Sequence, residues 1–189
     1  MSHSLLIHEP LRSGTARQQA AFAALQALQI FERLKPYTPV LAGTIPLDVD
    51  IADSDLDIIC ASEDLDGFVA QVASIYGNHR GYSAVRRRVE GRESLIIRFW
   101  AEGFEFEIFA QDRPVLEQSA VVHLLIEQRL LNLGGPAARE RIRTLKSEGL
   151  KTEPAFAQAF AIPGDPYQTL YELQSMSDAE LSARFGGGF

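Results

Sequence analysis

The chain has 189 residues, enough for one well-buried core or for one domain with a helical appendage. Its formal net charge of −7 argues against broad nucleic-acid binding, which relies on excess Lys and Arg, and its single cysteine, Cys60, excludes an intrachain disulfide. No run approaches the ~20 apolar residues of a membrane span and no signal-peptide pattern opens the chain, so we expect a cytoplasmic protein with no membrane contact.

The first predicted element is a helix over residues 13–35, where apolar residues recur at helical spacing until Pro36 ends it. A short buried strand over residues 39–42 then leads into Gly43-Thr44. This small turn would let backbone N–H groups approach an anion closely. The proline and aspartates of residues 45–54 indicate a loop.

The next strand, residues 55–61, carries two acids in alternation with apolar residues. Asp55 and Asp57 therefore point to one face of the strand, and Leu56 and Ile58 to the other. Two adjacent carboxylates repel each other unless a hard cation such as Mg²⁺ lies between them. A metal and an anion site together indicate a metal-bound phosphate. The alternative is a solvated strand edge or a pair of helix-capping acids.

After a helix expected to be capped by Ser62, the pattern changes to three strands over residues 82–89, 94–100 and 104–110. Turns at Glu90-Gly91 and Glu102-Gly103 predict an antiparallel meander. From Pro114 onward the chain reads as helical, with helices over 114–133, 136–148, 152–161, 165–174 and 177–185, and Ser177 with Glu180 has capping-box spacing at the start of the last one. The final Gly-Gly-Gly-Phe is expected to fray. We predict an α/β (α+β) core over residues 1–112 and a helical part over residues 113–189 packed on it.

Three stretches resemble known families. Gly43-Thr44, the loop and Asp55-Leu56-Asp57 resemble the active-site motif of DNA polymerase beta type nucleotidyltransferases, whose third acid lies on a later strand. Together, Leu41–Cys60, Trp100–Gln111 and Gly149–Tyr167 resemble a bacterial family of unknown function with a nucleotidyltransferase-like fold. The Gly-Thr pair departs from the commoner Gly-Ser.

The resemblance implies a nucleotidyltransferase-like mixed sheet flanked by helices, and transfer of a nucleoside monophosphate from an NTP to an unknown acceptor hydroxyl. Asp55, Asp57 and an acid of Phe104–Phe109 would hold Mg²⁺ (or Mn²⁺), while Gly43 and Thr44 would contact the phosphates. The alternatives are a non-catalytic nucleotide- or protein-binding module of this fold and a metal-dependent phosphohydrolase.

Several assignments stay open at this point. Either Glu105 or Glu107 fits the third acid, with Glu107 favoured. Arg98 fits a phosphate-binding guanidinium, and it equally fits a cross-strand partner for one of these glutamates. His123 and Glu127, four residues apart on a predicted helix, are typical of a helix-surface or interhelical hydrogen-bonded pair, and a role in proton transfer is the alternative.

Overall fold

The computed structural model describes residues 9–187, and the chain forms two units. The first unit contains the chain up to Pro46 together with Ser54–Gln118, and the second contains Leu47–Asp53 and everything from Ser119 onward. The sequence-based boundary after residue 112 therefore differs from this division by six residues and by the short loop. Gly188 and Phe189, where fraying is expected, lie outside the described residues.

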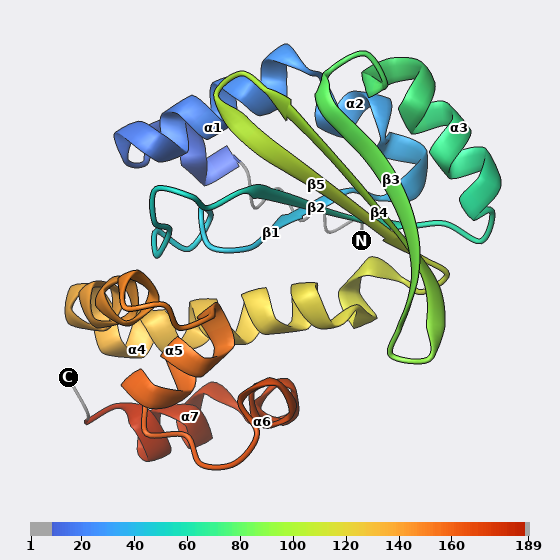
Figure 1. Cartoon of the computed structure of the whole chain (residues 1–189). Coiled ribbons are helices and arrows are strands. Elements are labelled where there is room, and N and C mark those ends of the chain that lie inside the picture. The colour runs from blue at the N-terminus through green and yellow to red at the C-terminus, as the bar shows by residue number, and fades with distance from the viewer. Residues whose placement is uncertain (1–8, 188–189) are drawn as a thin grey trace. The chain divides into compact units, whose positions relative to one another are not determined.

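A five-stranded mixed sheet forms the first unit (Figure 1), and this is the predicted fold class. Its strands follow the spatial order β1-β2-β5-β4-β3. Only β2 and β5 run parallel, and the other neighbours are antiparallel. The strands are β1 (Val40–Ala42), β2 (Leu56–Ala61), β3 (Arg80–Val89), β4 (Arg92–Ala101) and β5 (Phe104–Gln111).

The meander β3-β4-β5 is confirmed, and its two turns explain why it forms. Glu90-Gly91 and Glu102-Gly103 all have positive φ, which matches the right-handed twist of a two-residue hairpin. The parallel pairing of β2 with β5 joins segments about fifty residues apart in the sequence. That pairing is what brings the two acidic strands together.

One face of this sheet is covered by helices. α1 (Ala16–Ala27), α2 (Ile30–Arg33) and α3 (Leu65–Tyr76) lie on the same side of it (Figure 1). Phe99 and Phe106 point toward them and stack, with ring centroids 5.1 Å apart, and Tyr76 of α3 stacks on Phe99 at the same distance. Cys60 is buried in this core.

Two helix boundaries differ from prediction for local reasons. The single helix expected over residues 13–35 is broken at Gln29, whose left-handed backbone (φ 52°) separates α1 from α2. α1 begins with a capping box between Thr15 and Gln18. The N-cap of α3 is Asp64 and not Ser62, because the Asp64 carboxylate accepts a hydrogen bond from the Gly67 N–H.

The second unit consists of four helices among the described residues: α4 (Ser119–Ser147), α5 (Thr152–Ala159), α6 (Pro166–Leu173) and α7 (Asp178–Phe185). The first starts later than predicted because Val115–Glu117 forms a 3-10 turn. Gly135 is non-helical (φ 60°, ψ −150°) and kinks α4 just before Pro136, where the prediction placed a new helix. The predicted capping box of Ser177 and Glu180 is confirmed.

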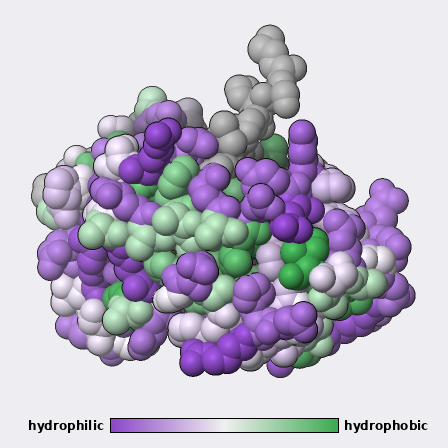
Figure 2. Space-filling view, turned by 90° about the horizontal axis from the view of Figure 1, so that it is seen from above, coloured by the Kyte–Doolittle hydropathy of each residue, from purple (hydrophilic) through white to green (hydrophobic). Residues whose placement is uncertain are grey.

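Side chains of α4 explain why Leu47–Asp53 belongs to the second unit. Arg143 forms an ion pair with Asp48 (2.6 Å), and Arg139 donates a hydrogen bond to the Leu47 carbonyl oxygen (3.4 Å). Over residues 9–187, the helices are too short or too polar for any of them to cross a membrane. The face shown in Figure 2 is mostly hydrophilic with a central apolar band, which is ordinary for a protein surface.

Candidate functional site

The face of the sheet opposite the helices carries a row of charged side chains. Asp57 of β2 lies directly opposite Glu107 of β5, and Glu107 lies directly opposite Arg98 of β4. Neighbouring strands are ~4.8 Å apart, so three consecutive strands present these groups side by side. Phe106, one residue before Glu107, points to the buried face and fixes this orientation by alternation.

The remaining candidate acids occupy the next position along the same face. Asp55 immediately precedes β2, two residues before Asp57, and Glu105 lies two residues before Glu107, opposite Trp100. Because Glu107 is the register partner of Asp57, it is better placed than Glu105 to share a ligand with Asp57. The two glutamates could not be separated from the sequence, because alternation puts both on the same face.

Glu107 is in a crowded electrostatic environment. Its pKa is raised above the ordinary value of 4.5, mainly because it is partly buried. The nearby Asp55 and Glu105 carboxylates raise it further, while the Arg98 guanidinium lowers it. Arg98 forms an ion pair with Glu107 through Nη2 and Oε2, so the cross-strand interpretation of Arg98 is confirmed.

The Gly43 turn ends β1 next to these acids. Ala42 is the register partner of Asp57, and Gly43 follows with φ +75°. A Cβ atom at residue 43 would overlap the Asp57 Oδ2 atom. The positive φ therefore favours glycine here, and any larger residue would also have to displace the Asp57 carboxylate.

Gly43→Ala should destabilise the protein by about 1–3 kcal/mol through left-handed backbone strain and should also displace the Asp57 carboxylate. Gly91→Ala is the matched control, because Gly91 has a similar φ (+78°) and no atom lies within 4 Å of the position that its Cβ would take. Chemical denaturation of both variants measures the difference. Equal losses would mean that Asp57 moves aside at no cost.

The ends of the loop between the turn and β2 are held by Arg17 and Gln18 of α1 and by Ser54, which the sequence did not single out. Gln18 of α1 donates to the Ile45 carbonyl oxygen (2.9 Å), and Arg17 donates to the Ser54 carbonyl oxygen (2.9 Å). The Thr44 hydroxyl donates to Ser54 Oγ (3.1 Å). Only the tertiary structure brings α1 to this loop, so no local sequence pattern could have revealed these contacts.

The acids are adjacent, but their side chains do not form a ready metal site. Over residues 9–187, no three His, Cys, Asp or Glu side chains are arranged to hold a metal ion as they stand. The Glu107 carboxylate points to Arg98 and forms an ion pair with it. The donor set itself, several carboxylates on one face beside a glycine turn, has the chemistry that Mg²⁺ or Mn²⁺ prefers.

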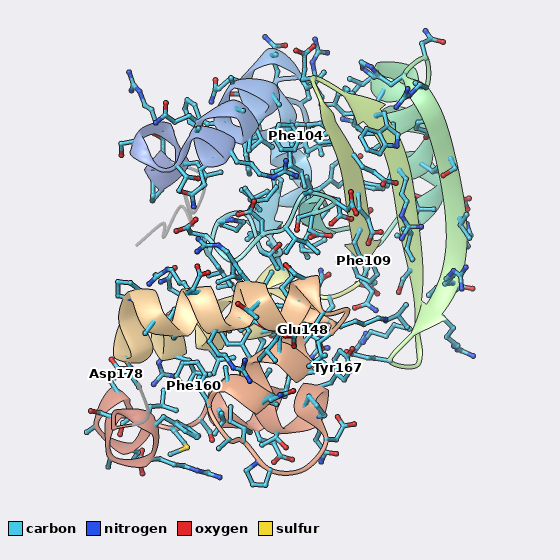
Figure 3. The ribbon with its side chains drawn as sticks, turned by 60° about the vertical axis from the view of Figure 1, so that its left-hand side comes forward. Phe104, Phe109, Glu148, Phe160, Tyr167 and Asp178 are labelled. Carbon is cyan, nitrogen blue, oxygen red and sulfur yellow. The ribbon has the colours of Figure 1, made fainter. Side chains whose placement is uncertain are left out.

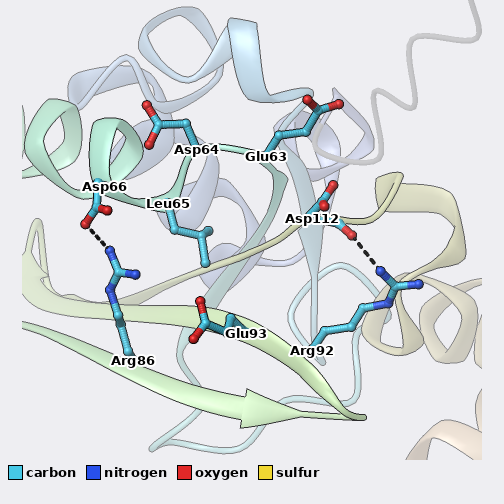
Figure 4. A pocket seen from close by; sticks show the side chains of 8 residues that line it. All are labelled: Glu63, Asp64, Leu65, Asp66, Arg86, Arg92, Glu93 and Asp112. Carbon is cyan, nitrogen blue, oxygen red and sulfur yellow. Dashed lines mark hydrogen bonds and ion pairs between the residues drawn. The ribbon is translucent and has the colours of Figure 1, made fainter.

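A separate hollow lies on the other side of the sheet (Figure 4). It has a volume of about 370 Å³, and its lining includes Asp64, Asp66, Arg86 and Arg92. Arg86 pairs with Asp66, and it is the register partner of Leu95, which points into the core. This hollow therefore opens on the helix side of the sheet, and it contains none of Asp55, Asp57 and Glu107.

A polar cluster is buried in the helical unit, where Figure 3 labels Tyr167. His123 Nε2 lies 3.0 Å from the Tyr167 carbonyl oxygen, and His123 Nδ1 lies 3.3 Å from Glu153 Oε1. The expected pairing of His123 with Glu127 is therefore replaced by pairing with Glu153. The carbonyl oxygen can only accept a hydrogen bond, so Nε2 must be the donor. Nδ1 then donates to the carboxylate when the ring carries both protons.

Two glutamates of this cluster have pKa values shifted in opposite directions. Burial strongly raises the pKa of Glu127, the Glu153 charge raises it further, and Lys146 opposes the shift. Glu127 Oε1 has no hydrogen-bond partner within the described part of the chain. Burial also raises the pKa of Glu153, but hydrogen bonds from His123 and the Glu153 backbone, with the charges of His123 and Lys151, outweigh it and lower this pKa.

Glu127→Gln should therefore change how stability depends on pH. The pKa of Glu127 in the folded protein is above 4.5. The contribution of this side chain to the free energy of unfolding is therefore fully present below about pH 4.5, and it is lost as the pH rises through the folded pKa. We expect the free energy of unfolding of the variant to be at least about 1 kcal/mol higher than that of the parent at neutral pH, because the substitution removes a buried carboxylate. Thermal unfolding from about pH 5 to pH 8 measures this. A less stable variant at neutral pH would mean that Glu127 is ionised opposite Lys146.

The described fold is similar to solved polymerase structures. The structure of Cid1 poly(U) polymerase with MgGTP bound superposes with a TM-score of 0.52 at 13% identity, over 88% of this chain and 53% of that one. The polymerase core of TRAMP, an RNA surveillance complex, superposes with a TM-score of 0.54 at 11% identity, over 97% of this chain and 66% of that one. The chain thus spans about half the length of the Cid1 enzyme, and at these identities the likeness establishes a nucleotidyltransferase-like fold.

Sequence comparison gives the family. No curated protein matches the chain. The profile of the family described as Domain of unknown function (DUF4269) matches residues 23–173, which contain both acidic strands, the glycine turn and the polar cluster of the helical unit. Since this match covers most of the sequence, the chain belongs to the DUF4269 family.

Proposed function

We propose that this protein is a metal-dependent nucleotidyltransferase that moves a nucleoside monophosphate from an NTP to an acceptor hydroxyl. The observation that carries the proposal is the register of β2 and β5, which pairs Asp57 with Glu107 on the sheet face that adjoins the glycine turn. The nucleotidyltransferase-like fold supports it independently.

Each residue has a role that follows from its position. Asp55, Asp57 and Glu107 would hold Mg²⁺ or Mn²⁺, with Glu105 next to them as an additional negative charge. Bound divalent ions would organise the triphosphate and lower the pKa of the acceptor hydroxyl. Gly43, half-buried at the end of β1, has no side chain, so the backbone N–H groups of the Gly43-Thr44 turn would bind phosphate oxygens. Arg17, Gln18 and Ser54 keep this turn and the start of β2 in register.

A binding module without catalysis is the second candidate, and one observation favours it. Glu107 is paired with Arg98, and the described side chains form no ready metal cluster. A protein that only binds nucleotides would need no third metal ligand. The two candidates make different predictions for pyrophosphate release.

The test is incubation of the full chain with each NTP and Mg²⁺ or Mn²⁺, followed by detection of pyrophosphate and inorganic phosphate and by thermal shift. A cell extract depleted of protein supplies small-molecule acceptors. Pyrophosphate that requires both metal and NTP supports transfer. Inorganic phosphate alone would indicate hydrolysis, a thermal shift without either product would indicate a binding module, and no response to any NTP would contradict the proposal.

A further inference from the structure

Arg98 is paired with Glu107, whose carboxylate the proposed metal site needs. Its guanidinium forms an ion pair with Glu107 across the β4–β5 register, while its side chain stays 45% exposed. Glu107 is the more buried partner at 20%. Arg98 thus reaches from the solvent side to a carboxylate set between Asp55, Asp57 and Glu105.

The guanidinium holds one oxygen of Glu107, Oε2, and its positive charge lies beside any cation that binds this carboxylate. Arginine stays protonated in proteins, so a change in pH does not remove the competition. A cation bound to Glu107 would also be repelled by a positive charge within a few ångströms. A free divalent cation therefore either displaces Arg98 from Oε2 or binds Oε1 against the charge of the guanidinium, and both routes weaken its binding. A metal–nucleotide complex brings phosphate oxygens, which are strong bidentate partners for a displaced guanidinium.

We propose that Arg98 makes the site select a divalent metal–nucleoside triphosphate complex over the free divalent cation. This inference rests on the proposed function, since it assumes that Asp57 and Glu107 bind metal. Arg98 has two roles here: it neutralises Glu107 in the metal-free protein, and it binds the triphosphate when the metal is bound to Glu107. Metal alone is thereby disfavoured, and metal with nucleotide is favoured.

The proposal predicts effects of opposite sign for Arg98→Gln. The affinity for Mn²⁺ alone should rise by about fivefold, because the competitor is gone. The affinity for NTP in saturating Mn²⁺ should fall by about tenfold, because a charge-assisted contact is lost. A residue with a purely structural role would not shift the two affinities in opposite directions. Arg98→Lys, which keeps the charge without the bidentate geometry, should lie between parent and glutamine variant in both measurements.

Arg87→Gln is the matched control for net charge. Arg87 is exposed on β3 and shares the sheet face of Arg98, but its register partner is Ser94, four residues from Arg98 and so about 13 Å along β4. It removes the same charge from the same face without touching Glu107. We expect Mn²⁺ affinity in this variant to stay within about twofold of the parent, since charges this far apart are screened.

The measurements are electron paramagnetic resonance of free Mn²⁺ and equilibrium dialysis of each NTP, on the full chain with circular dichroism to confirm folding. An Arg98→Gln protein that binds free Mn²⁺ no more tightly than the parent overturns the inference. An equal gain in Mn²⁺ affinity in Arg87→Gln also overturns it, and so does an NTP affinity that does not fall in Arg98→Gln. Adding Asp57→Asn to parent and Arg98→Gln separates the two claims: if neither protein loses Mn²⁺ binding, or if no protein binds Mn²⁺ with any NTP, the proposed function itself fails.

Discussion

Asp57→Asn should lower nucleotidyl transfer by at least about a hundredfold while leaving the fold intact. Loss of groups that merely orient metal ligands costs 10–100-fold, and a direct ligand should cost no less. The fold should survive, because one of several crowded carboxylates is removed and like-charge repulsion is relieved. Pyrophosphate release with Mg²⁺ and NTP measures activity, and thermal unfolding measures stability.

Asp66→Asn is the control for this experiment, since Asp66 pairs with Arg86 on the opposite side of the sheet. It should retain parental activity. If the Asp57→Asn protein is as active as the parent, the acidic residues on β2 and β5 have only a structural role. If it unfolds severely, Asp57 belongs to a hydrogen-bond network that the fold requires. Comparing Glu107→Gln with Glu105→Gln then identifies the third acid, and we expect the larger loss in Glu107→Gln because it faces Asp57.

Phe106→Ala should lower the free energy of unfolding by about 3–5 kcal/mol, a large part of the stability of a typical domain. Phe106 is fully buried and lies between Glu105 and Glu107 on β5. Its ring stacks on Phe99 with an interplanar angle of 1°, so truncation leaves a cavity beneath the acidic face. Chemical denaturation followed by circular dichroism measures the loss.

Phe109→Ala is the matched control, because Phe109 is the same residue type on the same strand, points to the opposite face and is only half-buried. Figure 3 labels it on β5 with Phe104, which points to the core. Its truncation should cost clearly less than that of Phe106. Equal losses would mean that the acidic face of the sheet is as tightly packed as the helix-covered face.

The sequence by itself determined the parts of this protein that depend on local patterns. Alternation of acid and apolar residues predicted β2 and β5 and the face that each carboxylate occupies, because side chains alternate strictly along a strand. Glu90-Gly91 and Glu102-Gly103 predicted the hairpins, since these residues supply the positive φ that tight turns require. Ser177 and Glu180 predicted a helix start by their spacing.

The tertiary structure decided everything that depends on contacts distant in sequence. The parallel register that places Asp57 opposite Glu107 joins strands with three elements between them, and no local pattern encodes a register at that separation. Packing of α1 likewise brings Arg17 and Gln18 to the loop before β2, whereas the pairing of Arg98 with Glu107 follows from the local β4–β5 hairpin. His123 pairs with Glu153 and not with Glu127 for the same reason: helical spacing makes two residues neighbours, but packing against another helix determines which carboxylate lies next to the imidazole.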